Sequence, residues 1–190
     1  DGNSWSVKNT LSTNAQIRGR AGTSTAALAI GSGEAPVNQN TEKWNGTTWT
    51  EVNNLLVGVF GQASAGTTTA AWSAGGSPYT ANSEIYDGTS WTEGNNINNQ
   101  RYGCAGMGTT TAAIMGGGSA PPWPNMTKFT ETYDGTCWTE VNNMNRGGYG
   151  MQGSGTQTAC IIAGGSDFPT INTETEKWDG TCWTEVADIT

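Results

Sequence analysis

The sequence predicts an all-β fold built from four repeated units of four strands each, and three observations carry this prediction. A motif that ends in tryptophan recurs at intervals of 44, 42, 47 and 45 residues, at Trp5, Trp49, Trp91, Trp138 and Trp183. Such a period is typical of one supersecondary unit used repeatedly. Each period holds four short runs rich in Thr and aromatic residues and bounded by Gly, Asn or Asp, which predicts strands. No segment shows a sustained helical apolar period, so no helix is expected.

The four runs follow one another in the same order in each unit. The first run is spaced by glycines and covers residues 60–66, 102–108 and 149–155. The second run is rich in Thr and Ala, ends in glycines, and covers residues 23–31, 67–76, 109–118 and 156–165. The third run leads to an aromatic residue such as Trp44 or Tyr86, and the fourth follows it, as at residues 49–52.

A turn signal separates the third run from the fourth. It is an Asn-Gly or Asp-Gly step, found at Asn45-Gly46, Asp87-Gly88, Asp134-Gly135 and Asp179-Gly180. Both central residues of a type I′ turn have positive φ, which Asn, Asp and Gly tolerate best. The sequence therefore predicts type I′ hairpins at these steps.

Side-chain size grows from the first run to the fourth. Glycines in the first run and alanines in the second, such as Ala112-Ala113, suit strands crowded around an axis. Trp and Tyr in the outer runs would fill the wider space between units. Four-stranded units arranged radially make a β-propeller. We expect blades at about residues 14–52, 57–94, 100–141 and 146–186, forming a single repeat array.

A family resemblance rests on the same residues. The order Tyr102-Gly103, Gly116-Gly117, Tyr133, Trp138 resembles the Kelch repeat, in which a di-glycine closes the second strand and a Tyr and a Trp follow. Two further units match through Gly75-Gly76 with Tyr86 and Trp91, and through Gly164-Gly165 with Trp178 and Trp183. The first unit departs from the pattern, with Gly31-Ser32-Gly33. The resemblance spans almost the whole chain and implies a binding scaffold or a copper-radical oxidase, without selecting between them.

Composition excludes several functions. The net charge is −8 and the eight basic residues are scattered, so a nucleic-acid footprint is absent. No apolar stretch reaches membrane-spanning length, and we expect no membrane insertion. The chain lacks an initiator Met and begins inside a repeat motif, so we expect a mature or partial segment of a longer protein.

The chain contains no histidine, which removes Ser-His-Asp and Cys-His catalysis and histidine metal sites. This argues against the oxidase branch, and we expect neither an enzyme nor a cofactor. Eight glutamates belong to the repeat, at Glu42, Glu84, Glu131 and Glu176 before the aromatic residue and at Glu51, Glu93, Glu140 and Glu185 after the Trp. They are interpreted as a solvated outer rim; the alternative is a carboxylate ring, but calcium needs several oxygens converging on one point.

Four cysteines are present, at Cys104, Cys137, Cys160 and Cys182. Cys137 and Cys182 hold one repeat position in adjacent units, which is expected to lie beyond disulfide reach. No CxxC spacing predicts zinc. We interpret the four as small buried side chains, which leaves the redox compartment open.

The variable connections predict a binding face. The turns from first to second run and from third to fourth barely change, whereas the connections from second to third and from fourth to first vary. In an up-and-down unit the two variable sets emerge on one face, as is usual for binding scaffolds. Trp123 and Asn125 lie there in a Pro-rich loop, and Tyr79 and Phe168 are the corresponding aromatics of neighbouring units. With nearby Asn, Asp and Arg, these rings suit sugar stacking; alternatively they cap the blades or pack on another protein.

Arg101 and Arg146 precede the Gly-rich run at like positions. They are expected to pair with a Glu, or to line the face for an acidic ligand. A hydrolase built on acids alone would need two non-repeat carboxylates at close range. The candidates for these are Glu34, Asp167, Glu174 and Asp188.

Two function classes therefore stay open. The first is a non-catalytic binding or structural module of a secreted or virion-borne protein, similar to phage tail fibres, which recognises protein or surface glycan. The second is a stand-alone lectin with aromatic loop sites. We expect an extracellular or virion location, and other chains or copies of this chain as partners.

The number of predicted outer strands exceeds the number of units. Residues 1–7 resemble an outermost strand, and so do residues 181–187, which makes five outer strands for four units. We therefore expect residues 1–7 to belong to a preceding blade, and the chain to be a segment of a larger ring or an arc completed by another copy. The alternative is a four-bladed ring with residues 1–7 along one edge. In the first case the outer faces of the end units stay apolar until covered.

Overall fold

Four antiparallel sheets of four strands each make up the regular structure of the computed structural model, which describes residues 6–12, 19–32 and 38–189. The first sheet contains β1 (Gly19–Gly22), β2 (Ala27–Ser32), β3 (Asn38–Trp44) and β4 (Trp49–Val52). The second contains β5 (Ala63–Gly66), β6 (Ala71–Ala74), β7 (Ser83–Tyr86) and β8 (Trp91–Glu93).

The third sheet contains β9 (Ala105–Thr109), β10 (Ala112–Gly116), β13 (Thr130–Tyr133) and β14 (Trp138–Val141). A small hairpin of β11 (Ser119–Ala120) and β12 (Asn125–Met126) is inserted between β10 and β13. The fourth sheet contains β15 (Gln152–Thr156), β16 (Ala159–Ala163), β17 (Thr175–Trp178) and β18 (Trp183–Val186). The all-β prediction is confirmed for the described residues, none of which is helical.

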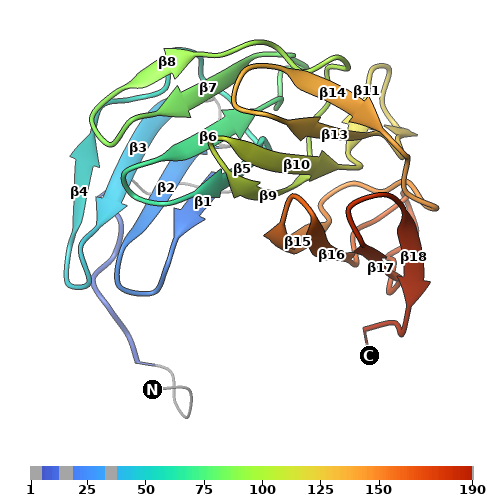
Figure 1. Cartoon of the computed structure of the whole chain (residues 1–190). Helices are drawn as coiled ribbons and strands as arrows, with labels where there is room; N and C mark the ends of the chain where they lie inside the picture. The colour runs from blue at the N-terminus through green and yellow to red at the C-terminus, as the bar shows by residue number, and fades with distance from the viewer. Residues whose placement is uncertain (1–5, 13–18, 33–37, 190) are drawn as a thin grey trace.

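The sheets follow one another in an open arc, with β4 and β18 at its two ends (Figure 1). Within each sheet the strands pair in chain order. The first strands of consecutive sheets contact one another, in the pairs β1–β5, β5–β9 and β9–β15. Arg20 of β1 donates a hydrogen bond to Gln152 of β15. The first strands of the first and fourth sheets, at the two ends of the arc, therefore also approach each other.

Each predicted span of four runs contains one sheet, although residues 14–18 of the first span lie outside the described residues. So do residues 1–5 of the expected extra outer strand and Glu34. Ser6 and Val7, the described end of that strand, have no regular secondary structure, and Val7 is fully exposed. The segment is nevertheless attached to the first sheet, because Asn9 donates to the Thr47 carbonyl and Ser12 donates to the Glu42 carboxylate.

The hydrophobic core is divided into three clusters, and each lies between two consecutive sheets. Leu28 of the first sheet packs with Tyr86 and Trp91 of the second. Trp72 of the second sheet packs with Tyr133 and Trp138 of the third, its ring centroid 5.2 Å from that of Trp138. Ile114 of the third sheet packs with Trp178 and Trp183 of the fourth. One interface is therefore built three times.

The type I′ prediction for the hairpins is wrong. Four residues join Tyr86 to Trp91, and within that loop only Gly88 has positive φ, at 98°. The Asp87 carboxylate instead accepts hydrogen bonds from the backbone N–H groups of Thr89 and Ser90, both at 2.8 Å. An Asp side chain that caps the turn in this way makes a second positive φ unnecessary.

Candidate functional site

Five aromatic rings from three units meet in one patch, which we call the aromatic patch: Tyr79, Tyr102, Trp123, Tyr149 and Phe168. Trp123 lies at its centre, with ring centroids 5.9 Å from Tyr102, 5.4 Å from Tyr149 and 5.8 Å from Phe168. Tyr102 also contacts Tyr79 and Tyr149, at 5.1 Å in both cases. These edge-to-face and tilted contacts are the arrangements that aromatic pairs prefer.

The positions of the rings follow from the strands that flank them. Trp123 lies at the tip of the β11–β12 hairpin, where three prolines surround it and stiffen the turn. Tyr79 and Phe168 come from the β6–β7 and β16–β17 connections. Tyr102 and Tyr149 lie three residues before the first residues of β9 and β15 and form isolated bridges to Ser119 and Ser166.

The centre of the patch is accessible. Trp123 is 41% exposed and Phe168 60% exposed, whereas the three tyrosines are half-buried beneath them. The Tyr79 hydroxyl lies 3.3 Å from the Ser119 hydroxyl, which holds the edge of the patch. The backbone of Phe168 has a φ of 38°, which lies outside the regions that aromatic residues ordinarily adopt and is therefore strained. Strain of this kind is concentrated at functional sites in proteins.

A polar cluster lies next to Phe168. Arg146 makes a salt bridge to Asp167 at 2.8 Å and another to Glu174, and donates to the Asn172 side chain. The side chains of Arg146 and Asp167 are 31% and 41% exposed. Two of the acids considered for catalysis, Asp167 and Glu174, are thus joined through one arginine, while Asp188 lies exposed in the C-terminal segment.

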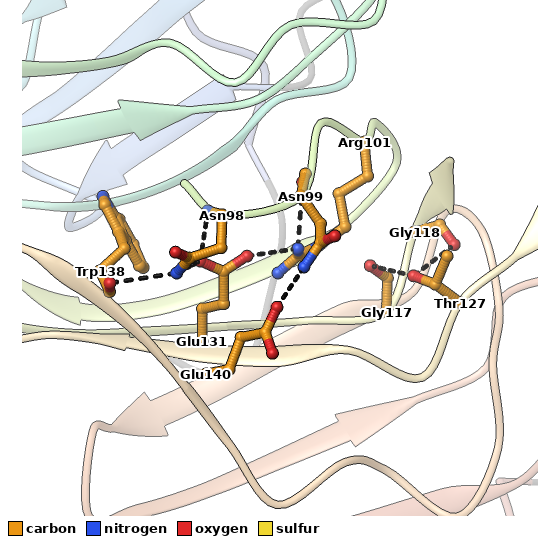
Figure 2. Close-up of polar contacts among 9 residues, drawn as sticks. All are labelled: Asn98, Asn99, Arg101, Gly117, Gly118, Thr127, Glu131, Trp138 and Glu140. Carbon is orange, nitrogen blue, oxygen red and sulfur yellow. Dashed lines mark hydrogen bonds and ion pairs between the residues drawn. The ribbon is translucent and has the colours of Figure 1, made fainter. Parts of the chain in front are cut away.

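Arg101 is not on this surface, and the expectation that it holds the same repeat position as Arg146 is wrong. The Arg101 carbonyl accepts a hydrogen bond from Gly76 as the Gly148 carbonyl does from Gly118, so Gly148 is its counterpart. Its side chain is fully buried and makes a 2.5 Å salt bridge to Glu131, which is equally buried. The expected pairing with a Glu is found, but burial removes Arg101 from any role at the ligand surface. Figure 2 shows the guanidinium and the Glu131 carboxylate facing each other.

The interpretation of the first glutamate set as a solvated rim is wrong. Glu42, Glu84, Glu131 and Glu176 are at most 4% exposed. Each carboxylate accepts hydrogen bonds from the segment that enters its sheet, as Glu131 does from the backbone N–H and side-chain amide of Asn98, both at 2.8 Å (Figure 2). Backbone donors left over between two strands are satisfied in this way. Burial raises the pKa of Glu84 despite the hydrogen bonds that it accepts.

Asn125 lies exposed in β12, where it pairs with Ala120 next to the turn that carries Trp123. The four cysteines are free, but only Cys104 and Cys160 are buried, so the prediction of burial is wrong for Cys137 and Cys182. Between the innermost strands lies a cavity of about 60 Å³, lined largely by backbone together with Arg20, Gln62 and Gln152, and no predicted site residue lines it.

The described residues contain no group of three or more Cys, Asp or Glu side chains able to hold a metal ion. They also include no helix that is long and apolar enough to cross a membrane. Comparison with known proteins adds no family, since no protein-family model and no curated protein matches the chain.

The structure brings together Tyr79, Trp123 and Phe168, which sequence reasoning had placed on one face, and adds Tyr102 and Tyr149. These two tyrosines were interpreted only as the start of the Gly-spaced run. The signal that points to them is the aromatic-Gly step at one repeat position, which places each ring over the glycine of the preceding unit. A Cβ atom on Gly103 would lie 2.1 Å from the Tyr149 ring.

Proposed function

We propose that this chain is a non-catalytic binding module of a secreted or virion-borne protein, and that the aromatic patch holds its ligand. The single observation that carries this proposal is the patch itself. Five rings converge, and two of them, Trp123 and Phe168, are exposed to solvent. Aromatic residues in such clusters dominate the energetics of binding surfaces.

The proposed architecture is a Kelch-type β-propeller segment of four blades. It is supported by the contacts between the first strands of consecutive sheets and by the small residues that fill those strands. Aromatic pairs on the outer strands, such as Tyr133–Trp138 with centroids 5.0 Å apart, fill the wider space between sheets. A rigid scaffold of this kind suits a protein that presents loops on one face.

The ligand class that fits the patch best is a surface glycan. The exposed Trp123 and Phe168 rings offer flat apolar faces, and the partly exposed Arg146 and Asp167 side chains beside Phe168 offer hydrogen-bonding groups. Sites with apolar walls and a few convergent polar groups are typical of small-ligand recognition. A protein partner that packs on the same rings is the other candidate within this function.

A stand-alone lectin with one sugar site per unit is the alternative function. The aromatic loop residues favour it, but Tyr79, Trp123 and Phe168 gather into a single patch rather than forming separate sites. One shared patch supports one ligand per chain. The stoichiometry of binding therefore separates the two functions.

A glycan array followed by titration of intrinsic tryptophan fluorescence tests the proposal. Trp123→Ala is expected to weaken binding by about 2 kcal/mol or more, as truncation of a central aromatic anchor does, which corresponds to roughly thirtyfold in Kd. Phe168→Ala is expected to weaken it as well. Leu56→Ala is the matched control, since Leu56 is 53% exposed and has no place in the patch.

Three outcomes decide between the functions. Binding of one glycan per chain that depends on Trp123 supports the proposal, and several equal sites per chain support the lectin. Silence on the array, with a protein partner captured through Trp123, assigns the patch to protein recognition. Binding that is unaffected by both Trp123→Ala and Phe168→Ala contradicts the proposed site.

A further inference from the structure

The two ends of the arc carry the two halves of the interface that the chain builds three times internally. We call the face of each sheet that packs on the next sheet its trailing face. This face carries Leu28, Trp72, Ile114 and Ile161 in the four sheets. Each of them directly follows the residue of β2, β6, β10 or β16 that pairs with the first aromatic residue of the hairpin. The opposite face, with the aromatic pairs such as Trp44–Trp49, is the leading face.

No further sheet among the described residues packs on the trailing face of the fourth sheet. Leu28, Trp72 and Ile114 are at most 1% exposed, whereas Ile161 is 42% exposed. The residues that follow each sheet show the same difference. Leu55, Ile97 and Met144 each donate a backbone N–H to a carbonyl at the start of the third strand of their sheet or just before it, and are at most 4% exposed. At the equivalent position Ile189 makes the same hydrogen bond, to Thr173, but is 51% exposed.

A polar atom at this face points to the chemistry of what covers it. The hydroxyls of Thr41 and Thr130 accept hydrogen bonds from the indole N–H groups of Trp91 and Trp183 in the next sheet, at 3.1 and 3.0 Å. Thr175 holds the same position in the fourth sheet. It is 3% exposed, and its hydroxyl is buried without a partner among the described residues. The bond is present in two of the three internal interfaces, because the Ser83 hydroxyl and the Trp138 indole between the second and third sheets are both buried without a partner among the described residues. A buried hydroxyl without a partner is costly, and an indole N–H supplied by a further sheet would satisfy that of Thr175.

The leading face of the first sheet offers that indole. Its aromatic pair is Trp44–Trp49, with ring centroids 5.4 Å apart, close to the 5.1 Å of Tyr86–Trp91. Trp49 is half-buried, whereas Trp91, Trp138 and Trp183 are at most 6% exposed. Ala27 beside it is half-buried, while the equivalent Ala71 and Ala113 are fully buried.

We propose that a second copy of this chain docks the leading face of its first sheet on the trailing face of the fourth sheet. Ile161 then lies against the Trp44–Trp49 pair of the other copy, and the Trp49 indole N–H donates to the Thr175 hydroxyl. The interface reproduces the three internal ones in residue type. Because its two halves differ, the contact is heterologous, and copies assemble into a ring if the rotation closes and into an open chain if it does not.

One local adjustment is required. Asn9 and Ser12 bind the first sheet as Asn95 and Asn98 bind the third, so Leu11 holds the position equivalent to Ile189. When the two faces meet, either the 9–12 segment of one copy or the end of the other copy moves aside. The 9–12 segment does not supply the equivalents of Ile161 and Thr175, which the fourth sheet of the other copy supplies.

Native mass spectrometry and sedimentation over a concentration series test the proposal. The chain is expected to form species above its monomer mass of 19.8 kDa that grow with concentration. Ile161→Asp is expected to leave only monomer, because it places a charge in the apolar contact. Ile171→Asp is the matched control, since Ile171 is an isoleucine of the same unit that is 78% exposed but lies in the β16–β17 connection.

Complementation of two variants tests the heterologous pairing directly. Trp49→Asp blocks the leading face and Ile161→Asp blocks the trailing face, so each alone is expected to be monomeric. Mixed together, they retain one intact face each and are expected to form a one-to-one dimer and nothing larger. A wild-type chain that stays monomeric at its highest soluble concentration overturns the proposal, as does a mixture that shows no dimer while circular dichroism shows both variants folded.

Discussion

Two arginines that precede the Gly-rich runs of neighbouring units have opposite surroundings. Arg101 lies in the interior with Glu131, whereas Arg146 lies at the surface with Asp167 and Glu174. The worth of an ion pair depends strongly on burial. A surface pair is screened by water, whereas removal of one partner of a buried pair leaves an uncompensated charge in a low-dielectric interior.

The first prediction compares these two arginines. Arg101→Met is expected to lower the free energy of unfolding by about 3–5 kcal/mol, because Glu131 is left buried and unpaired. Arg146→Met is the matched control and is expected to cost only about 0–1 kcal/mol, as exposed pairs do. Urea unfolding followed by tryptophan fluorescence measures both. Equal losses for the two variants would contradict the difference in burial.

The second prediction concerns the thiols. Burial raises the pKa of Cys104 to about 11 and that of Cys160 to about 12, so both stay protonated and shielded at neutral pH. Cys137 and Cys182 are exposed, although the Asp179 carboxylate raises the pKa of the Cys182 thiol. The thiolate is the reactive form. Iodoacetamide is therefore expected to label Cys137 and Cys182 in the folded chain, with Cys182 slowed.

Peptide mass spectrometry reads out the labelling site by site. Labelling in denaturant, where all four thiols are expected to react, is the control. Rapid modification of Cys104 or Cys160 under native conditions would show that the interfaces between sheets open readily.

At the scale of single elements, the hairpin loops are stabilised by a side chain and a glycine together. In the loop after β13, Asp134 accepts hydrogen bonds from the backbone of Thr136 and Cys137, and Gly135 has a φ of 95°. The same pair of bonds recurs at Asp87 and Asp179. Turn geometry is therefore a property of the repeated motif itself.

The third prediction is that Gly135→Val destabilises the fold without affecting binding at the aromatic patch. The expected cost is about 1–3 kcal/mol, since a β-branched residue resists positive φ. The strain is conformational rather than steric, because the nearest atom to an added Cβ is 3.4 Å away. Thr136→Val, at an exposed neighbour without positive φ, is the control in the same thermal melts. A Gly135→Val variant that melts like the parent but loses its ligand would reverse the two roles.

The fourth prediction follows from the charge of the loop carboxylates. Hydrogen bonds from the backbone of Ser90 and Thr89 lower the pKa of Asp87, and the equivalent bonds lower those of Asp134 and Asp179. A group with a lowered folded pKa stabilises the fold above its unfolded pKa, near 4, and this contribution is lost as pH falls through the folded value. The melting temperature is therefore expected to fall below about pH 4.

The matched variant replaces all three loop aspartates with asparagine, which keeps an acceptor oxygen but cannot titrate. Its melting temperature is expected to fall less steeply over the same acid range. Glu84, whose pKa burial raises, acts in the opposite direction, because its contribution is lost as pH rises. It is present in both chains and cancels in the comparison. Identical acid dependence in the two chains would contradict the role of the loop carboxylates.

At the scale of the whole molecule, stability is unevenly distributed along the arc. The second and third sheets are covered on both faces by neighbouring sheets, as the full burial of Trp72 and Ile114 shows. Among the described residues, the first and fourth sheets each pack on one neighbouring sheet only (Figure 1). In a repeat array the terminal units contribute fewer interface contacts and are correspondingly less stable.

The fifth prediction compares equivalent tryptophans along the arc. Trp138→Ala is expected to cost about 3–5 kcal/mol, because it empties the interface between the second and third sheets. Trp49→Ala is expected to cost less than half as much, since Trp49 is half-buried at the end of the arc. Urea unfolding in an Ile161→Asp background keeps self-association out of the comparison. Equal costs would mean that the end sheets are covered in solution even when the chain is monomeric.

Much of the fold was predictable from local pattern. The spacing of the tryptophans, the glycine-bounded runs and the Asp-Gly steps lie within one unit, and each constrains backbone geometry over a few residues. They predicted four units of four strands and a hairpin after Trp44, but not the four-residue loop that pairs Trp44 with Trp49. They also placed Tyr79, Trp123 and Phe168 on one face. In an up-and-down unit, the connections from the second strand to the third and from the fourth strand to the next first strand emerge on the same side.

What only the tertiary structure decided involves residues that belong to different units. Glu131 and Asn98 lie 33 residues apart, and nothing in either local pattern distinguishes a buried clamp from a solvated rim. Arg101 lies one residue before Tyr102 and Arg146 lies three residues before Tyr149. That only Arg101 is buried depends on which sheet lies alongside. The contact of Tyr102 with Tyr149, the exposure of Ile161 and the unpartnered hydroxyl of Thr175 also depend on packing between units. Backbone preference is a local property, whereas burial, charge pairing and an open interface depend on how separate sheets pack.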